Sequence, residues 1–133
     1  MDARPYVHVI MPVGSEPRAL GKKAAIATGI KHIGYEARFP DYLPQRPTFS
    51  LPELIGEMVG ADAIIADLTR ERPSCYYELG IAEALGKTVY IIAELGTPIH
   101  QTAKRLEVHY YRNLEDLTET IIGICKNNIA GRA

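Results

Sequence analysis

The chain has 133 residues, of which 47% are hydrophobic and 23% charged, and its formal net charge is -1. This composition is typical of a globular protein, and the length predicts one domain over residues 1–133. The small net charge argues against a nucleic-acid binder that works by bulk electrostatics. No apolar run approaches the roughly 18 residues of a membrane span, and no secretory signal precedes the first predicted strand, so we expect a cytoplasmic protein without a membrane partner.

Cysteine and histidine spacing argues against a metal centre. Cys75 and Cys125 lie far apart and form no CxxC pair, and the four histidines show no ligand spacing. We therefore expect no disulfide, no metal and no cofactor.

Apolar runs alternate with segments of helical periodicity along the chain. Strands are predicted at 6–11, 35–39, 63–68, 89–93 and 108–111. Helices are predicted at 19–33, from 51, at 75–85 and at 114–128, with a helical turn at 99–105. Ser50, Ser74 and Asn113 are the expected caps, and the first helix is expected to bury Leu20, Ala24, Ala27, Ile30 and Ile33. This alternation predicts a three-layer α/β fold whose five-stranded parallel sheet has the flavodoxin-like order 2-1-3-4-5.

In such folds a ligand binds beyond the carboxyl ends of the strands, where the strand order reverses. Here that position lies between the first and third strands, so it gathers the segment 11–18, the loop after Asp67 and the start of the helix that holds Glu78. The binding residues predicted there are Met11, Pro12, Gly14, Ser15, Arg18, Thr69, Tyr76 and Tyr77.

Two acidic residues, Glu78 and Asp67, are the predicted catalytic residues. Glu78 lies in the first turns of a helix, where the macrodipole favours an ionised carboxylate that can act as a nucleophile or pair with a cationic centre. The alternatives are a solvated glutamate and a glutamate that complements the charge at the helix N-terminus. Asp67 ends a buried strand, where it binds either a ligand or the backbone amides of the following turn.

The run ADLTRERPSCYYELGIAEALGKTVYII at 66–92 resembles the signature stretch of the nucleoside 2-deoxyribosyltransferase-like superfamily. The flanking pieces VIMPVG and GTPIHQTAKRLEVHYYRNLEDL extend the resemblance over most of the chain, and they look closest to a branch described as similar to TIR domains. The resemblance implies that Glu78 is a nucleophile that attacks the anomeric carbon of a nucleoside or nucleotide, as in retaining glycosidases. It places Asp67 in the base and sugar region, and residues 14–18 beside the sugar or the 5′-phosphate.

The chain departs from the resembling enzymes at two places. Leu54 stands where they carry an aspartate, and Ile10, Met11 and Pro12 stand where they often carry a tyrosine. Three functions therefore stay open: an N-glycosidase or deoxyribosyltransferase, a nucleotide-binding sensor that does not cleave, and a TIR-like NAD hydrolase. The resemblance also implies a homo-oligomer, a dimer or larger, for which exposed apolar candidates are Tyr42, Leu43, Phe49 and Tyr111.

Overall fold

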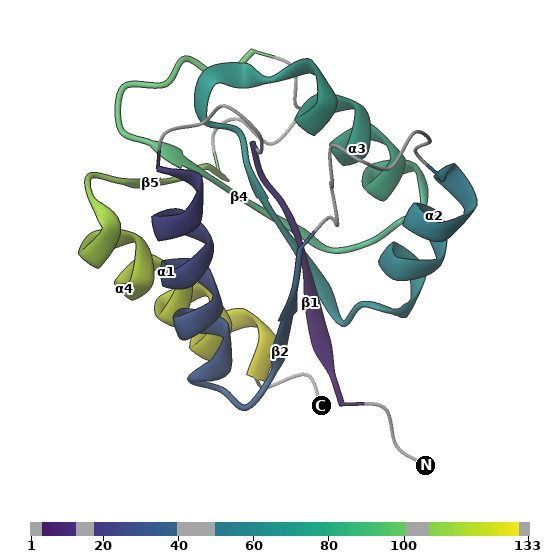
Figure 1. The fold of residues 1–133 in the computed structure, drawn as a ribbon, viewed down its shortest axis with the longest axis horizontal. Coiled ribbons are helices and arrows are strands. Elements are labelled where there is room, and N and C mark those ends of the chain that lie inside the picture. The colour runs from purple at the N-terminus through teal and green to yellow at the C-terminus, as the bar shows by residue number, and fades with distance from the viewer. Residues whose placement is uncertain (1–3, 13–17, 40–49, 101–106, 131–133) are drawn as a thin grey trace.

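The computed structural model describes residues 4–12, 18–39, 50–100 and 107–130 (Figure 1). Its five strands form a sheet in the order β2-β1-β3-β4-β5, and every neighbouring pair is parallel. The strands are β1 (Tyr6–Ile10), β2 (Glu36–Arg38), β3 (Ala63–Asp67), β4 (Val89–Glu94) and β5 (His109–Tyr111). The predicted three-layer α/β fold and its strand order are confirmed.

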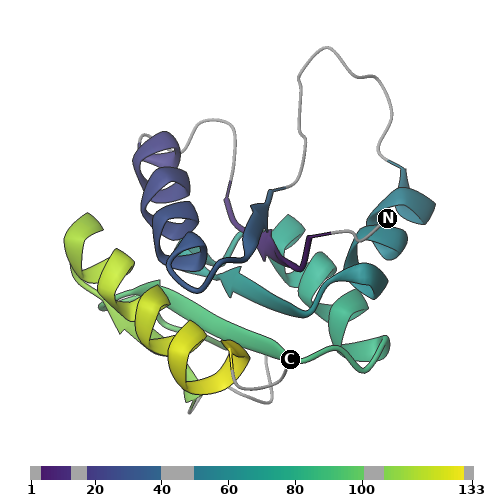
Figure 2. The same cartoon turned by 90° about the horizontal axis from the view of Figure 1, so that it is seen from below.

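Helices cover both faces of the sheet (Figures 1 and 2). One layer holds α1 (Ala19–Lys31) and α4 (Leu114–Ile124), and the other holds α2 (Leu51–Gly60) and α3 (Pro73–Ala84). The 3-10 helix η1 (Thr69–Glu71) follows β3, and the π-helix η3 (Cys125–Ile129) continues α4. No helix among the described residues has the length and apolar character needed to cross a membrane.

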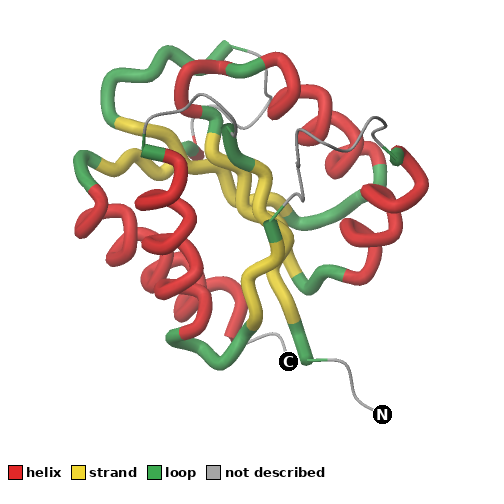
Figure 3. Tube along the Cα trace, in the orientation of Figure 1, coloured by secondary structure: helices red, strands yellow, loops and turns green. Residues whose placement is uncertain are grey.

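The sheet lies between the two layers of helices (Figure 3). It separates two hydrophobic clusters, to which the strands contribute alternately. In β1, Tyr6 and Ile10 lie in the cluster beneath α2 and α3, whereas Val7 and Val9 lie in the cluster beneath α1 and α4. This alternation follows from the two-residue period of a strand. It decides on which face each polar side chain of the sheet lies.

The helix starts agree with the cap predictions at two of three positions. The Ser50 hydroxyl accepts a bond of 3.3 Å from the Glu53 amide, and the Asn113 side chain accepts one of 2.8 Å from the Asp116 amide. The third cap is wrong, because α3 already begins at Pro73 with Arg72 at its N-cap. Proline suits the first helical position, since its fixed φ and missing N–H are no loss there.

The predicted buried face of α1 is correct at Ile30, and Ile33 packs against the core, but it is wrong at Leu20 and Ala24. Leu20 is 84% exposed and Ala24 is exposed, while the buried residues are Lys22, Ala25, Ile26, Gly29 and Ile30. A β-carbon on Gly29 would lie 2.6 Å from a carbon of Ile121, so the glycine permits the close approach of α4. A further difference lies near the carboxyl end of the chain. The helix predicted to reach residue 128 changes to π geometry after Ile124, and most of the turn predicted at 99–105 lies outside the described residues.

Candidate functional site

Asp67 lies at the carboxyl end of β3 and is fully buried. Its Oδ1 accepts bonds from the Thr69 amide (3.0 Å) and the Thr69 hydroxyl (2.6 Å), and its Oδ2 accepts one from the Tyr111 hydroxyl (2.8 Å). The carboxylate thus fixes the turn after β3 and joins it to β5. Tyr111 is only 1% exposed, so its prediction as an exposed apolar residue is wrong.

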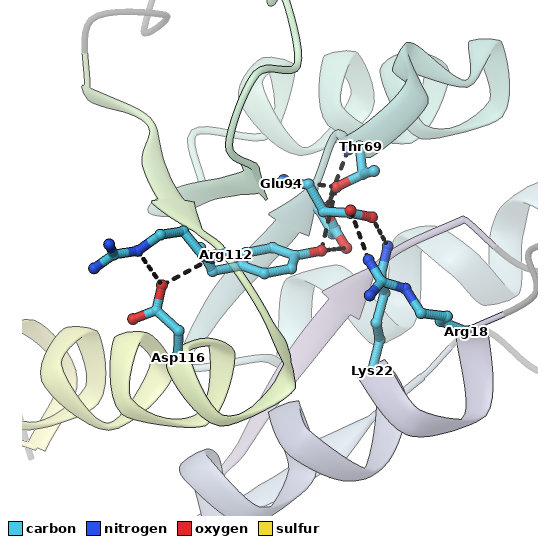
Figure 4. A network of polar contacts seen from close by, with 8 residues as sticks. Arg18, Lys22, Thr69, Glu94, Arg112 and Asp116 are labelled. Carbon is cyan, nitrogen blue, oxygen red and sulfur yellow. Dashed lines mark hydrogen bonds and ion pairs between the residues drawn. The ribbon is translucent and has the colours of Figure 1, made fainter.

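The polar network continues from Thr69 to β4 and α1 (Figure 4). The Glu94 amide donates to the Thr69 hydroxyl (2.9 Å), and the Glu94 carboxylate pairs with Lys22 (2.6 Å) and Arg18 (2.7 Å). The Lys22 side chain has no exposed surface, whereas that of Arg18 is about half exposed. Three strand ends and the start of α1 are therefore held together by charged and hydroxyl groups.

Burial and charge act in opposite directions on the acids of this network. Burial raises the pKa of Asp67, and this effect exceeds the opposing effects of its hydrogen bonds and of Lys22. Burial also raises the pKa of Glu94, but Lys22 and Arg18 outweigh it and bring the pKa below its ordinary value. For Tyr111, burial and the nearby Asp67 carboxylate both raise the pKa, so its hydroxyl remains a donor.

The loop between β3 and α3 is strained. Arg70 and Glu71 have φ values of 67° and 47°, in the left-handed region that non-glycine residues rarely adopt. Such residues cost of order 1–3 kcal/mol each and persist where neighbouring groups hold them. Here the Glu71 carboxylate accepts bonds from the Tyr76 hydroxyl (2.8 Å) and the His100 amide (3.2 Å). Strain of this kind is concentrated at binding and catalytic loops.

An open hollow of about 490 Å³ lies beside this loop, at the carboxyl ends of β3 and β4. Its lining consists of Arg18, Thr69, Arg70 and the segment Glu94, Leu95, Gly96, Thr97 and Pro98. The two guanidinium groups in this lining suit an anionic group such as a phosphate, and one of them, that of Arg18, also pairs with the Glu94 carboxylate. Apart from Arg18, the lining follows β3 and β4, whereas the strand order predicts a ligand between β1 and β3.

Glu78 is 5% exposed, in the second turn of α3. Its Oε1 is buried, and it has no hydrogen-bond partner in the part of the chain that the structure describes. Burial raises the pKa of Glu78 to about 7, so the carboxyl is about half ionised at neutral pH. The solvated glutamate considered as an alternative is wrong, because this side chain is buried.

Cys75 is the nearby thiol, one turn before Glu78. Burial first, and then the Glu78 and Asp67 carboxylates, raise the pKa of Cys75 to about 12. The thiol therefore stays protonated at neutral pH and is a poor nucleophile. Among the described residues, no group of three His, Cys, Asp or Glu side chains has a metal-binding arrangement.

The predicted site residues do not all meet in one crevice. Asp67 pairs in register with Ile92, which belongs to the cluster beneath α1 and α4, while Glu78 lies on α3 across the sheet. Met11 is buried in that same α1–α4 cluster, and Pro12 is buried. Tyr77 is 52% exposed on the outer side of α3. Gly14 and Ser15 lie outside the described residues.

Three members of the network were missed from the sequence: Lys22, Glu94 and Tyr111. Lys22 is buried and its neighbour Lys23 is exposed. Because both are lysines in the same helix, the sequence pattern does not tell which of them is buried. Glu94 and Tyr111 end the fourth and fifth strands. Because the carboxyl ends of parallel strands lie at one edge of the sheet, this position could have identified both residues as members of the network.

No family model matches the chain, and no curated protein matches it in sequence. Solved structures do match. A 2-deoxyribosyltransferase from the psychrotolerant bacterium Bacillus psychrosaccharolyticus is 18% identical with a TM-score of 0.61, and the match covers 85% of this chain and 90% of that one. A diflavin flavoprotein A3 from Nostoc sp. is 13% identical with a TM-score of 0.62, covering 94% of each chain. The TIR domains of the activated Roq1 resistosome are 12% identical with a TM-score of 0.52, covering 96% of this chain and 75% of that one.

At these identities the likeness concerns the fold. The chain shares its α/β architecture with a deoxyribosyltransferase, a flavoprotein and TIR domains. Because one fold hosts many functions, the choice among them depends on the side chains of the site.

Proposed function

We propose that this protein cleaves the bond between base and sugar in a nucleoside or nucleotide, with Glu78 as the nucleophile. The observation that carries the proposal is the state of Glu78, a carboxyl group 5% exposed with an unpartnered oxygen. A buried polar group without a partner costs about 1–3 kcal/mol, so a group that is retained in this state is suited to interact with a ligand. The fold shared with a 2-deoxyribosyltransferase supports the same reaction class.

The proposed chemistry follows that of retaining glycosidases. The Glu78 carboxylate attacks the anomeric carbon while the bond to the base breaks, and the electron pair of that bond leaves with the base. Water, or a second base in a transferase, then displaces the carboxylate from the sugar. The two arginines at the rim of the hollow, Arg18 and Arg70, are proposed to bind a 5′-phosphate.

The test is release of free base from a panel of nucleosides, nucleotides and NAD, followed by chromatography. We expect release by the wild type and none by Glu78→Gln. The matched control is Glu83→Gln, because Glu83 is an exposed glutamate on the same helix, and it should keep wild-type activity. If the wild type releases no base from any compound, the proposed reaction is wrong.

A binding module that does not cleave is the second candidate, and Leu54 favours it. The resembling enzymes carry an aspartate at this position, but Leu54 is 9% exposed and belongs to the core beneath α2 and α3. General acid assistance contributes about 10²–10⁴-fold to such reactions, so a chain without it is slow or inactive. This candidate predicts that a nucleotide raises the melting temperature and is recovered intact. Hydrolysis of the bound nucleotide contradicts it.

A TIR-like NAD hydrolase is the third candidate, supported by the fold shared with TIR domains. It predicts release of nicotinamide from NAD in the same panel, with Glu78→Gln inactive. Release of base from deoxynucleosides with no release of nicotinamide separates the first candidate from this one.

We also propose that the protein self-associates through the outer surface of α2 and α3. Leu51 and Val59 on α2 are 38% and 57% exposed, and Tyr77 and Leu85 at α3 are 52% and 38% exposed. The two helices pack together, and we propose that a second copy covers their exposed apolar residues. Sedimentation should give a dimer or larger that Val59→Glu dissociates, while Leu20→Glu on α1 does not. A monomeric wild type contradicts this proposal.

A further inference from the structure

His8 carries a second buried polar atom without a partner. The side chain is 3% exposed, and its Nε2 and the Glu78 Oε1 are the two buried side-chain atoms in the described ranges that make no hydrogen bond. Native structures rarely leave such atoms unpaired, because each costs about 1–3 kcal/mol. One ligand that contacts both atoms would explain why both lack a partner.

His8 lies on the face of the sheet that α2 and α3 cover. Its neighbours in alternation, Tyr6 and Ile10, both belong to the cluster beneath these helices. The Tyr6 hydroxyl donates to the carbonyl of Glu57 (2.6 Å), which places α2 above this part of β1. The Glu57 carboxylate also acts on the pKa of His8, although burial is the larger effect and lowers that pKa. The imidazole is therefore neutral at neutral pH.

Glu78 lies on the flank of α3 that is turned toward α2 and β1. On the opposite flank, two residues earlier, the Tyr76 hydroxyl donates to Glu71 of η1, the short helix that contacts β4. Two residues of an α-helix differ by about 200° in direction, so Glu78 points the other way. Just beyond α3, Lys87 donates to the carbonyl of Ala61 (2.7 Å), which fixes the end of α2 on this side. In addition, α3 packs directly against β1.

We infer that His8 and Glu78 face one space between β1, α2 and α3 and contact the same ligand there. For the class of ligand, a nucleoside, the inference rests on the proposed function; for the position of the site it rests on the two unpartnered atoms. His8 Nε2 hydrogen-bonds a hydroxyl or ring nitrogen of the nucleoside whose anomeric carbon faces Glu78. A neutral imidazole nitrogen can donate or accept according to its tautomer, so it suits either group.

The experiment measures stability and binding together in His8→Leu, with 2′-deoxyadenosine and its 5′-monophosphate as probes. Replacing a buried unpartnered nitrogen by an apolar side chain should raise the melting temperature of the free protein by about 4 °C. The same change should weaken probe binding, measured by calorimetry, about tenfold or more. His8→Gln keeps a nitrogen near the position of Nε2 and should retain part of the affinity.

The control is His32→Leu, because His32 is exposed after the end of α1, and it should change neither quantity. His8→Phe is the second apolar variant, in case leucine packs poorly. A lower melting temperature in both apolar variants identifies His8 as an ordinary stabilising core residue and overturns the inference. Wild-type affinity in both variants, or no binding of either probe to the wild type, also overturns it.

The outcome is distinguishable from failure of the proposed reaction. If the wild type binds a probe without releasing base, and His8→Leu loses that binding, the shared site stands and the reaction does not. If base release persists in His8→Leu with unchanged KM, the reaction stands and the role of His8 does not.

Discussion

Replacing Glu78 by glutamine should stabilise the folded protein increasingly as the pH rises. Burial raises the pKa of Glu78 to about 7, from 4.5 in an unperturbed glutamate. The folded state thus holds its proton over a pH range in which the unfolded state has lost it. Stability conferred by the protonated carboxyl is complete below the unfolded pKa and is lost as the pH rises toward the folded pKa.

The magnitude follows from the size of this pKa difference. At about 1.36 kcal/mol for each unit, ionising Glu78 in the folded state costs about 3 kcal/mol once the pH exceeds both values. Glutamine carries no charge at any pH, so the variant escapes this cost. Its free energy of unfolding, relative to that of the wild type, should increase by roughly 2–3 kcal/mol between about pH 5 and pH 8.

The assay is urea denaturation of both proteins at a series of pH values, with Glu83→Gln as the control. The exposed Glu83 should give a difference from the wild type that does not vary with pH. A Glu78→Gln difference that is equally flat would refute the reasoning, since it would mean that the carboxyl is solvated in the folded protein.

Three further predictions follow from the site and the packing. The kcat/KM for base release should rise with pH and level off above an apparent pKa of about 7. The reason is that the nucleophile must be ionised, and burial raises the pKa of Glu78 to about 7. A profile that is flat from about pH 5 to 9 contradicts this prediction. Tyr111→Phe should destabilise the protein by about 1.5–3 kcal/mol in urea denaturation, because it removes a hydroxyl that donates to a buried carboxylate, whereas Tyr110→Phe at an exposed neighbour should have little effect. Gly29→Ala should destabilise the protein by about 1–3 kcal/mol, because the added carbon would lie 2.6 Å from a side-chain carbon of α4. Gly123→Ala is the control: its added β-carbon meets open space, so it should stabilise the protein by about 0.5–1 kcal/mol.

The architecture was predictable because local patterns determine it. Strands and helices alternate, and the caps at Ser50 and Asn113 mark two helix starts, so a parallel sheet with the observed order followed. Glu78 was selected from its place in the first turns of a helix after a strand-end loop and from the family resemblance, and its catalytic role stays a prediction. These inferences need only neighbouring residues.

The side-chain directions within the site were not predictable in the same way. Both faces of a parallel strand are buried, so the run 63–66 is apolar throughout and gives no sign of the face on which Asp67 lies. The sequence therefore did not indicate that Asp67 lies on the face beneath α1 and α4, whereas Glu78 lies on α3 over the other face. The burial of Lys22 was not predicted, because its partner Glu94 lies 72 positions away along the chain.

The stereochemistry of cleavage tests the central claim, a Glu78 nucleophile, most directly. The wild type is incubated with a deoxynucleoside in the presence of methanol, and the methyl glycoside formed is examined by proton NMR before it can equilibrate. Two successive displacements, the first by Glu78, predict that the product retains the anomeric configuration of the substrate. An inverted product, or the same product at an undiminished rate from Glu78→Gln, would contradict the claim.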